Sequence, residues 1–218
     1  MIPRPWVVLL AAGGSRRFGA PKQLARIGGE SLLRRAARVA LAAAPAGCVV
    51  VLGARASRLT RELEDLPIRT VVNRCWQSGL GRSLALGIAA LPVDARAALV
   101  LLADQVAVGA ADLELLCAAW RAAPTAIIAA RSGRIVGPPA VFPRRHFPEL
   151  RRLRGDQGAR ELLRDGTRRV VAVELAAASA DIDWPRDFDR VRRERFRART
   201  RQSSRSSRAR RSKPSGAT

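Results

Sequence analysis

The sequence predicts an α/β fold, with an open, doubly wound and mostly parallel sheet. Apolar runs alternate with amphipathic helical patterns up to about residue 174, which is typical of repeated strand–helix–strand units. The first run, residues 6–12, is continuously apolar, as expected of a strand covered on both faces. The 218 residues are enough for one well-buried domain, and we expect that domain to span residues 1–195.

The first half of the chain alternates regularly. The pattern predicts strands at 6–12, 49–53 and 69–72, and helices near 31–44 and 58–64. Right-handed crossovers between parallel strands would bring the carboxyl ends of these strands to one edge of the sheet. Ligands of such sheets bind beyond that edge, so candidate functional residues are sought at strand ends.

The second half continues the pattern less regularly. It predicts a helix at 83–91, a strand at 97–103, a helix at 112–121 and a strand at 125–130. Residues 133–165 then form a looser segment with Gly and Pro, a short apolar run at 139–142 and a helix near 156–164, which suggests an insertion over the site. A strand at 170–174 and a helix at 185–195, with Pro185 in its first turn, complete the domain.

The formal net charge of +22 is concentrated at the C-terminus, where residues 190–218 contain 12 Lys and Arg against one Glu. Because this Arg/Ser-rich stretch has little apolar surface to bury, we expect residues 196–218 to be a disordered basic tail. Such a tail could bind nucleic acid loosely through phosphates. With Phe196 as its one aromatic residue, a solvated extension without a selected role is the favoured interpretation.

The three cysteines, Cys48, Cys75 and Cys117, are far apart and form no Cys-x-x-Cys pair, which favours reduced packing residues. No apolar run approaches the roughly 20 residues that span a bilayer, and the N-terminus lacks a signal-peptide pattern. We therefore expect a cytoplasmic protein. His146 is the single histidine, so the sequence gives little support to a Ser/His/Asp triad or a histidine-bound zinc.

The clearest candidate site follows the first strand, where glycines occur together with basic side chains. The stretch contains Gly13, Gly14, Gly19, Arg16, Arg17 and Lys22. Glycine allows backbone N–H groups to turn inward around an anion, and the cations add charge, so a triphosphate is the natural ligand. The stretch has neither the ending of a Walker loop nor the Gly-x-Gly-x-x-Gly spacing. A purely structural turn is the alternative.

A carboxylate follows the buried strand at 97–103. Asp104, which Gln105 follows, lies where a parallel strand should end, and Mg²⁺ prefers such oxygen ligands together with substrate phosphates. Asp183, with Asp181 as its substitute, is the candidate second ligand. Helix capping or a loop position would also explain these aspartates.

Two further loops could contribute to a site. Asn73 and Ser83 flank a glycine-containing turn and could donate hydrogen bonds to a base or ribose, while Ser83 could equally be a helix cap. Asp156 and Arg160 belong to a second compact turn, where Asp156 could cap a helix and Arg160 could face an anion.

Taken together, residues 10–24, Asn73 with Trp76 and residues 78–83, Asp104 with Gln105, and residues 155–160 resemble the MocA/MobA-type nucleotidyltransferases, most closely the molybdenum cofactor cytidylyltransferases. The match runs from about residue 7 to residue 191. It implies a Rossmann-like sheet of the nucleotidyltransferase type and Mg²⁺-dependent transfer of CMP from CTP to molybdopterin, with release of pyrophosphate. A client molybdoenzyme or its maturation chaperone is an implied partner.

The resemblance also implies residue roles. Catalytic roles fall to Arg17, Lys22 and Asp104, and metal binding to Asp104 and Asp183. Nucleotide binding falls to Ala11, Ala12, Gly13, Gly14, Ser15, Lys22, Asn73, Ser78, Gly79 and Ser83. The acceptor side comprises Gly137, Asp156 and Arg160.

Departures from the family pattern concern the base and the acceptor. The guanylyl-transferring relatives usually carry Leu-Ala-Gly-Gly where this chain has Leu10-Ala-Ala-Gly13, which favours cytosine. Val106 replaces a usual proline, Phe18 a usual methionine, and Pro138 lies where His or Asn is usual; the last departure leaves the acceptor open. Alternatives are transfer to another phosphorylated acceptor such as a sugar phosphate, a basic nucleic-acid-binding protein with a degenerate domain, and a non-catalytic cofactor chaperone.

Overall fold

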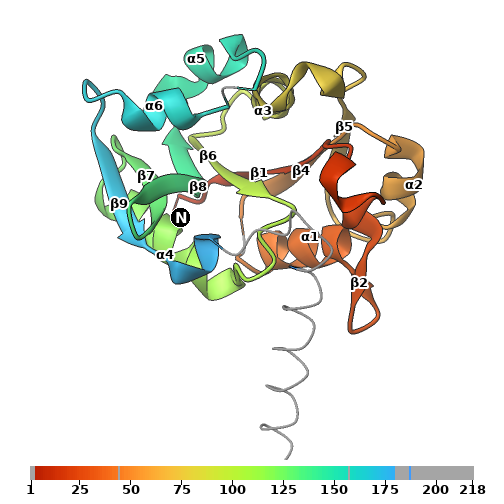
Figure 1. The fold of residues 1–218 in the computed structure, drawn as a ribbon. Coiled ribbons are helices and arrows are strands. Elements are labelled where there is room, and N and C mark those ends of the chain that lie inside the picture. The colour runs from red at the N-terminus through yellow and green to blue at the C-terminus, as the bar shows by residue number, and fades with distance from the viewer. Residues whose placement is uncertain (1–2, 44, 157, 180–186, 188–218) are drawn as a thin grey trace, which may run out of the picture.

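A computed structural model describes residues 3–43, 45–156, 158–179 and 187. A central sheet of seven strands organises this part of the chain (Figure 1). In order across the sheet, the strands are β5 (Arg69–Val72), β4 (Gly47–Leu52), β1 (Trp6–Ala11), β6 (Ala97–Leu102), β8 (Ile135–Pro143), β7 (Ile127–Ser132) and β9 (Val170–Glu174). Strand β8 is antiparallel to both of its neighbours, and the other adjacent pairs are parallel. The predicted α/β fold with a mostly parallel sheet is confirmed.

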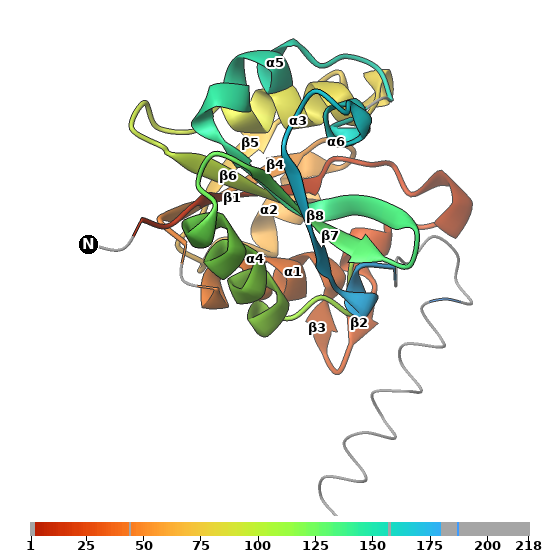
Figure 2. The same cartoon turned by 90° about the vertical axis from the view of Figure 1, so that its left-hand side faces the viewer.

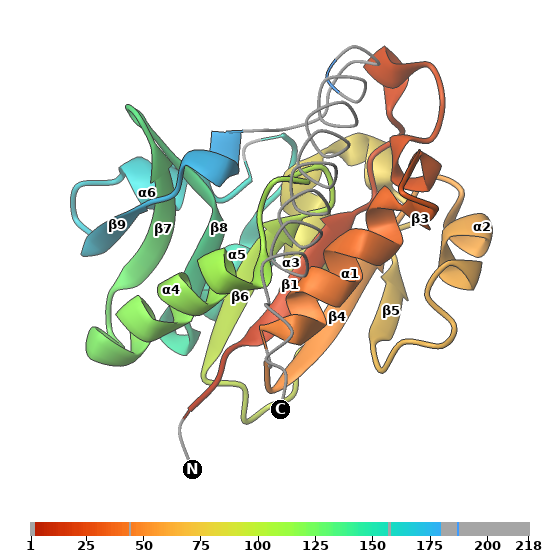
Figure 3. The same ribbon diagram turned by 90° about the horizontal axis from the view of Figure 1, so that it is seen from below.

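Helices cover both faces of the sheet, as Figures 1 and 2 show. One face carries α1 (Leu32–Ala42), α2 (Ala56–Arg61) and α4 (Ala110–Ala122), and the opposite face carries α3 (Leu80–Ala89), α5 (Phe147–Arg152) and α6 (Arg160–Arg164). The view in Figure 3 has α1 and α4 in front of the sheet. Both faces of the central strands are therefore shielded from solvent, which explains their uninterrupted apolar sequences.

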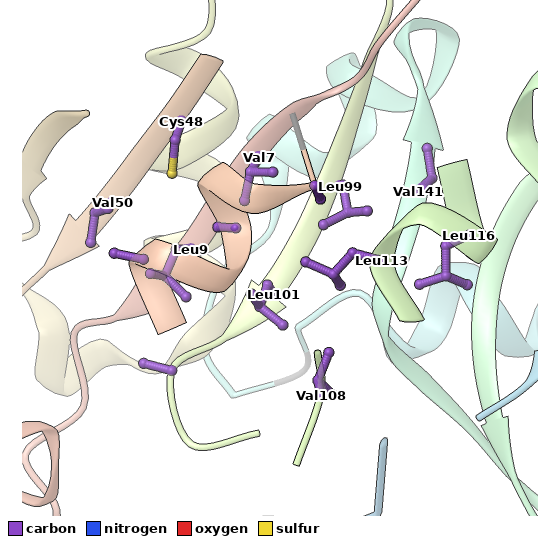
Figure 4. Close-up of a cluster of buried hydrophobic side chains, with 14 of the residues drawn as sticks. Val7, Leu9, Cys48, Val50, Leu99, Leu101, Val108, Leu113, Leu116 and Val141 are labelled. Carbon is purple, nitrogen blue, oxygen red and sulfur yellow. The ribbon is translucent and has the colours of Figure 1, made fainter. Parts of the chain in front are cut away.

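The alternation of side chains along β1 divides the core into two layers. Val7 and Leu9 belong to the cluster with α1 and α4, whereas Val8 and Leu10 belong to the cluster with α3 and α5. Figure 4 shows the first cluster, in which Leu113 of α4 lies beside Leu99 and Leu101 of β6. This packing fixes β1 next to β6, and both strands end at the same edge of the sheet.

Short elements complete the structure, several of them at the edge where β1 and β6 end. A hairpin of β2 (Arg26–Ile27) and β3 (Glu30–Ser31) leads into α1, whose first turn Ser31 caps by accepting a hydrogen bond from the Arg34 N–H. Single turns of 3₁₀ helix occur at η1 (Arg16–Phe18), η2 (Lys22–Leu24), η3 (Trp76–Ser78), η4 (Arg144–His146) and η5 (Ala176–Ser179). A small apolar cluster of Ile27, Leu32 and Val106, with Phe18 against it, joins the segment after β1 to the segment after β6.

The structure corrects one sequence expectation and extends another. Residues 135–143 are not part of an insertion over the site but form β8, which lies inside the sheet between β6 and β7. Helix α5 is an element that the sequence pattern did not predict. Asp181, Asp183, all of the helix predicted at 185–195 except Asp187, and the tail at 196–218 lie outside the described residues. Within the described part, no helix is long and apolar enough to cross a membrane.

Candidate active site

The segment after β1 is a tight loop that an internal glutamine holds in shape. Ser15 has a φ of 54° and Gly19 a φ of 73°, so the backbone turns sharply at both positions. The Gln23 side chain is buried beneath the loop; its Nε2 donates to the Gly13 carbonyl at 2.6 Å, and its Oε1 accepts from the Ser15 hydroxyl at 3.0 Å. The Ser15 hydroxyl in turn accepts from the Lys22 N–H at 3.1 Å. These bonds fix the course of the backbone on which Gly13 and Lys22 lie.

Lys22 and Asp104, which are 82 positions apart in sequence, form an ion pair across the site. Lys22 Nζ lies 2.7 Å from Asp104 Oδ2, and the two side chains are 15% and 22% exposed. Asp104 lies in the turn that follows β6, and Lys22 comes from the loop after β1, the strand beside it. The two predicted catalytic residues therefore share one pocket, as the sequence hypothesis requires.

The second carboxylate oxygen of Asp104 is buried and has no hydrogen-bond partner. A buried anionic oxygen without a partner is costly, and a divalent cation would satisfy it. Within the described residues, no group of three or more His, Cys, Asp and Glu side chains is placed to hold a metal. Mg²⁺ commonly uses one or two protein carboxylates together with substrate phosphates. The single carboxylate of Asp104 is therefore enough for that kind of site.

A cleft of about 450 Å³ surrounds the Lys22–Asp104 pair. The loop after β1 forms one wall, and the N-terminal end of α3 with Trp76 forms another. The predicted site residues that line it are Ala11, Ala12, Gly13, Gly14, Ser15, Arg17, Lys22, Gly79, Ser83, Asp104 and Asp156. A Cβ on Gly14 would lie 2.7 Å from the Trp76 ring, so glycine lets the loop approach that wall. The cleft combines backbone amides, cations and a carboxylate, which suits a metal-bound polyphosphate.

Asn73 and Ser78 are not among the residues that line the cleft. Asn73 is buried; its Nδ2 donates to the Ser83 hydroxyl at 3.0 Å, and its Oδ1 accepts from the Cys75 N–H at 3.0 Å. The exposed Ser78 hydroxyl donates to the Cys75 carbonyl at 2.6 Å. In this structure both side chains shape the turn between β5 and α3, and Asn73 orients Ser83, which does line the cleft.

The turn before α6 reaches the cleft through close backbone packing. Gly81 N–H donates to the Gly155 carbonyl at 2.9 Å, and Gly79, with a φ of 102°, would place a Cβ 2.3 Å from the same oxygen. This contact brings Asp156 to the cleft wall. Arg160 is exposed on α6, and it does not line the cleft.

Gln105 connects Asp104 to the segment predicted to face the acceptor. Its Nε2 donates to the Pro138 carbonyl at 2.8 Å and to the Ala178 carbonyl at 3.3 Å, and its Oε1 accepts from the Leu102 N–H at 3.3 Å. Gly137, the predicted acceptor residue, precedes Pro138 on β8 and lies outside the cleft lining. Sequence reasoning assigned no role to Gln23 or Gln105. The sequence feature that could have indicated these roles is the position of each glutamine directly after a predicted site residue, Gln23 after Lys22 and Gln105 after Asp104.

His146 lies at the other end of the sheet. It belongs to η4, which follows the end of β8 that pairs with the beginning of β6, at Ala97 opposite Pro143. The imidazole is buried and is not among the cleft residues. His146 therefore lies apart from the cleft.

Comparisons with known proteins give matches over most of the chain. The family model described as the MobA-like NTP transferase domain matches residues 7–172. The purine catabolism protein PucB of Bacillus subtilis (strain 168) is 32% identical over 199 residues, which cover 85% of this chain and 95% of PucB.

Three solved structures extend the comparison. Rv0371c of Mycobacterium tuberculosis H37Rv has 30% identity and a TM-score of 0.77, and the match covers 88% of this chain and 100% of that one. The manganese complex of Rv0371c has 30% identity and a TM-score of 0.72, and the match covers 86% of this chain and 97% of that one. Molybdopterin-guanine dinucleotide biosynthesis protein A of Archaeoglobus fulgidus, at 15% identity and a TM-score of 0.66 over 88% and 99% of the two chains, shares the fold.

Proposed function

The chain belongs to the MobA-like NTP transferase family, and on this premise we propose that it transfers CMP from CTP to molybdopterin in a Mg²⁺-dependent reaction. The products are the cytosine dinucleotide form of the molybdenum cofactor and pyrophosphate. The chain is a nucleotidyltransferase by family and fold; the base, the acceptor and the metal are the proposed part. The product would pass to a client molybdoenzyme or its maturation chaperone.

The observation that carries the proposal is the Lys22–Asp104 ion pair inside the cleft. A cation from the glycine loop and a carboxylate with an unpartnered buried oxygen meet at 2.7 Å. A triphosphate needs both a cationic cradle and a place for its metal, and the cleft offers the two side by side. A structural salt bridge would explain the pair, but it would leave the buried Asp104 Oδ1 unexplained.

The reaction follows from this arrangement. An oxygen of the terminal phosphate of molybdopterin attacks the α-phosphorus of CTP in line, and the bond from that phosphorus to the bridging oxygen of the β-phosphate breaks. The N–H groups of Gly13 and Gly14, with Arg17 and Lys22, hold the β- and γ-phosphates and the departing pyrophosphate. Asp104, with Asp183 as a proposed second ligand, would hold Mg²⁺, which when bound neutralises charge on the phosphates. No covalent enzyme intermediate is needed.

Two features support the choice of base and metal. The Leu10-Ala-Ala-Gly13 sequence is the form found in the cytidylyl-transferring branch, and both alanines line the cleft. The manganese complex of Rv0371c, which is 30% identical to this chain, supports a divalent cation. Asn73, Ser78 and Gly79 as nucleotide-binding residues, and Gly137, Asp156 and Arg160 on the acceptor side, remain proposed substrate contacts.

A second candidate is transfer to another phosphorylated acceptor, such as a sugar phosphate. Pro138 favours it, because this residue departs from the family pattern at the segment over the acceptor site and its carbonyl is already bonded to Gln105. The two candidates share the nucleotide site and differ in what lies opposite it.

Pyrophosphate release from purified protein distinguishes these candidates. With Mg²⁺ and CTP, we expect release when molybdopterin is present and none with sugar phosphates; turnover with GTP in place of CTP would contradict the base assignment. Asp104→Asn should lower kcat/KM by about 10²- to 10³-fold, the usual cost of one electrostatic contact in the transition state. The control Asp65→Asn removes a carboxylate that pairs with Arg34 at 2.5 Å on the surface and should leave the rate unchanged.

A further inference from the structure

A second concave surface lies on the α3 and α5 side of the molecule. It is a groove of about 530 Å³ at the end of β5, beside the packed helices α3 and α5 that Figures 1 and 2 show next to each other. Four arginines, Arg74, Arg82, Arg151 and Arg154, line it, and we call it the arginine groove. We propose that the arginine groove binds an acidic, partly apolar segment of a partner protein.

No carboxylate in the described part of the chain balances the charge of the groove. Some arginines elsewhere pair with carboxylates, as Arg34 does with Asp65 and Arg121 does with Glu114. Within the described residues, none of the four groove arginines has a carboxylate within ion-pair distance, and no Asp or Glu is among the groove residues. Four unpaired cations on one surface create a local positive potential that attracts an anionic ligand.

The apolar floor of the groove favours an acidic peptide over nucleic acid as the ligand. It is formed by the apolar side chains of Val72, Ala85, Leu86 and Ala89, and Val72 is 46% exposed. Nucleic acid would leave this floor without a partner, because the groove has no aromatic side chain on which a base could stack. A peptide that presents acidic side chains to the rim and apolar side chains to the floor matches both features.

The groove and the catalytic cleft lie on opposite sides of the segment that joins β5 to α3. Ser83 lines the cleft, whereas its neighbour Arg82 lines the groove, and Asn73 joins the two by its bond to Ser83. A partner docked in the groove would lie beside the cleft. The proposal does not depend on the base or the acceptor, because binding alone tests it.

Cys75 provides a local reporter, since it lines the groove and is exposed. Cys48 and Cys117 are buried, and burial raises their thiol pKa values to about 12 and about 11, so iodoacetamide at neutral pH should react at Cys75. The probes are short peptides that alternate Asp or Glu with Leu or Val, selected from a displayed pool on the full chain. Polyglutamate and short single-stranded RNA are the comparison ligands.

We expect the selected peptide to slow the alkylation of Cys75, and to do so at lower concentration than polyglutamate or RNA. Arg82→Gln/Arg151→Gln, with one change on each wall of the groove, should raise the half-protecting concentration by about tenfold. The control Arg58→Gln/Arg61→Gln removes the same charge from exposed positions on α2 and should leave it unchanged. Failure to select any peptide, binding that leaves Cys75 unprotected, equal effects of both double variants, or stronger protection by RNA would overturn the proposal.

Discussion

At the scale of single residues, the shape of the phosphate loop depends on Gln23. Its buried amide bonds both the Gly13 carbonyl and the Ser15 hydroxyl, so Gln23→Leu would remove the side-chain donor to the Gly13 carbonyl and the acceptor of the Ser15 hydroxyl proton. We expect a loss of stability of about 1–3 kcal/mol and a rise in the KM for CTP that exceeds the fall in kcat, because the substitution disorders the loop rather than removing a reacting group.

Urea unfolding and steady-state kinetics check this prediction. Gln77 also lines the cleft, but it is exposed and bonds no part of the loop, so Gln77→Leu is a suitable control for stability. A Gln23→Leu protein as stable as the Gln77→Leu protein would show that the amide does not hold the loop.

His146 predicts the direction of a pH effect on stability. Burial, and then the charge of Arg145, lower the pKa of its imidazole below the usual 6.5. The unfolded chain therefore takes up a proton at a higher pH than the folded chain does, and the stabilising contribution is present above pH 6.5 and lost as the pH falls toward the lowered value. The free energy of unfolding should fall between about pH 7.5 and about pH 5.5.

Because His146 is the single histidine of the chain, His146→Gln is a direct test of this assignment. Denaturant titrations at the two pH values should show a smaller difference for the variant than for the wild type. An undiminished difference in the variant would assign the effect to other groups.

The pair of Lys22 and Asp104 could be predicted from sequence, whereas the roles of Gln23 and Gln105 could not. Glycines, cations and a carboxylate at strand ends have a recognisable chemistry of their own. Gln105, by contrast, bonds backbone carbonyls of Pro138 and Ala178, which are 33 and 73 positions away. Only the folded chain reveals such partners.

At the scale of elements, helix α3 packs on the sheet through a glycine. A Cβ on Gly87 would lie 2.5 Å from Val8 Cγ1 and 2.9 Å from Val51 Cγ2. Gly87→Ala should therefore push α3 away from β1 and β4 and cost about 1–3 kcal/mol, only partly offset by the better helix propensity of alanine, about 1 kcal/mol.

Urea unfolding measures this cost, and Gly166→Ala serves as the control. No atom lies within 4 Å of a Cβ at Gly166, so that variant should be as stable as the wild type. A Gly87→Ala protein at least as stable as the wild type would contradict this prediction, because it would mean that the interface between α3 and the sheet accommodates the added methyl group without loss of stability.

Sequence periodicity located most elements and missed β8 for a physical reason. In β8 the residues from Pro139 to Pro143 are buried, whereas its first four are exposed or half-buried. Gly137, Pro138 and Pro139 interrupt the apolar pattern, and the register with β7 shifts at Ala129 and Ala130. A strand that is apolar over half its length resembles a loop with a short apolar run, which is how residues 133–142 were interpreted from sequence.

At the scale of the whole molecule, the sequence could predict strand ends at one edge but not which strands are neighbours. The site depends on β1 and β6 being neighbours in the sheet. Along the chain, two other strands of the same sheet, β4 and β5, come between them, so their adjacency results from packing in the folded protein. The resemblance to a family provided that information indirectly, because relatives with the same motifs share the fold.

The basic tail is a whole-molecule feature with its own prediction. Residues 196–218 lie beyond the part of the chain that contains the cleft residues, so a protein ending at Arg195 should release pyrophosphate at the rate of the full chain. The same comparison separates catalysis from nucleic-acid binding, since binding through the tail would be lost on truncation. Loss of transfer activity in the truncated protein would contradict the proposed domain boundary.

The central claim is that the loop after β1 and Asp104 hold one metal-bound CTP between them. Calorimetric titration of CTP into the full chain, with Mg²⁺ and with EDTA, tests it most directly. We predict binding at least about tenfold tighter with Mg²⁺, loss of that difference in Asp104→Asn, and weaker binding in Lys22→Met under both conditions. CTP affinity that is independent of Mg²⁺ and unchanged in both variants would contradict the claim.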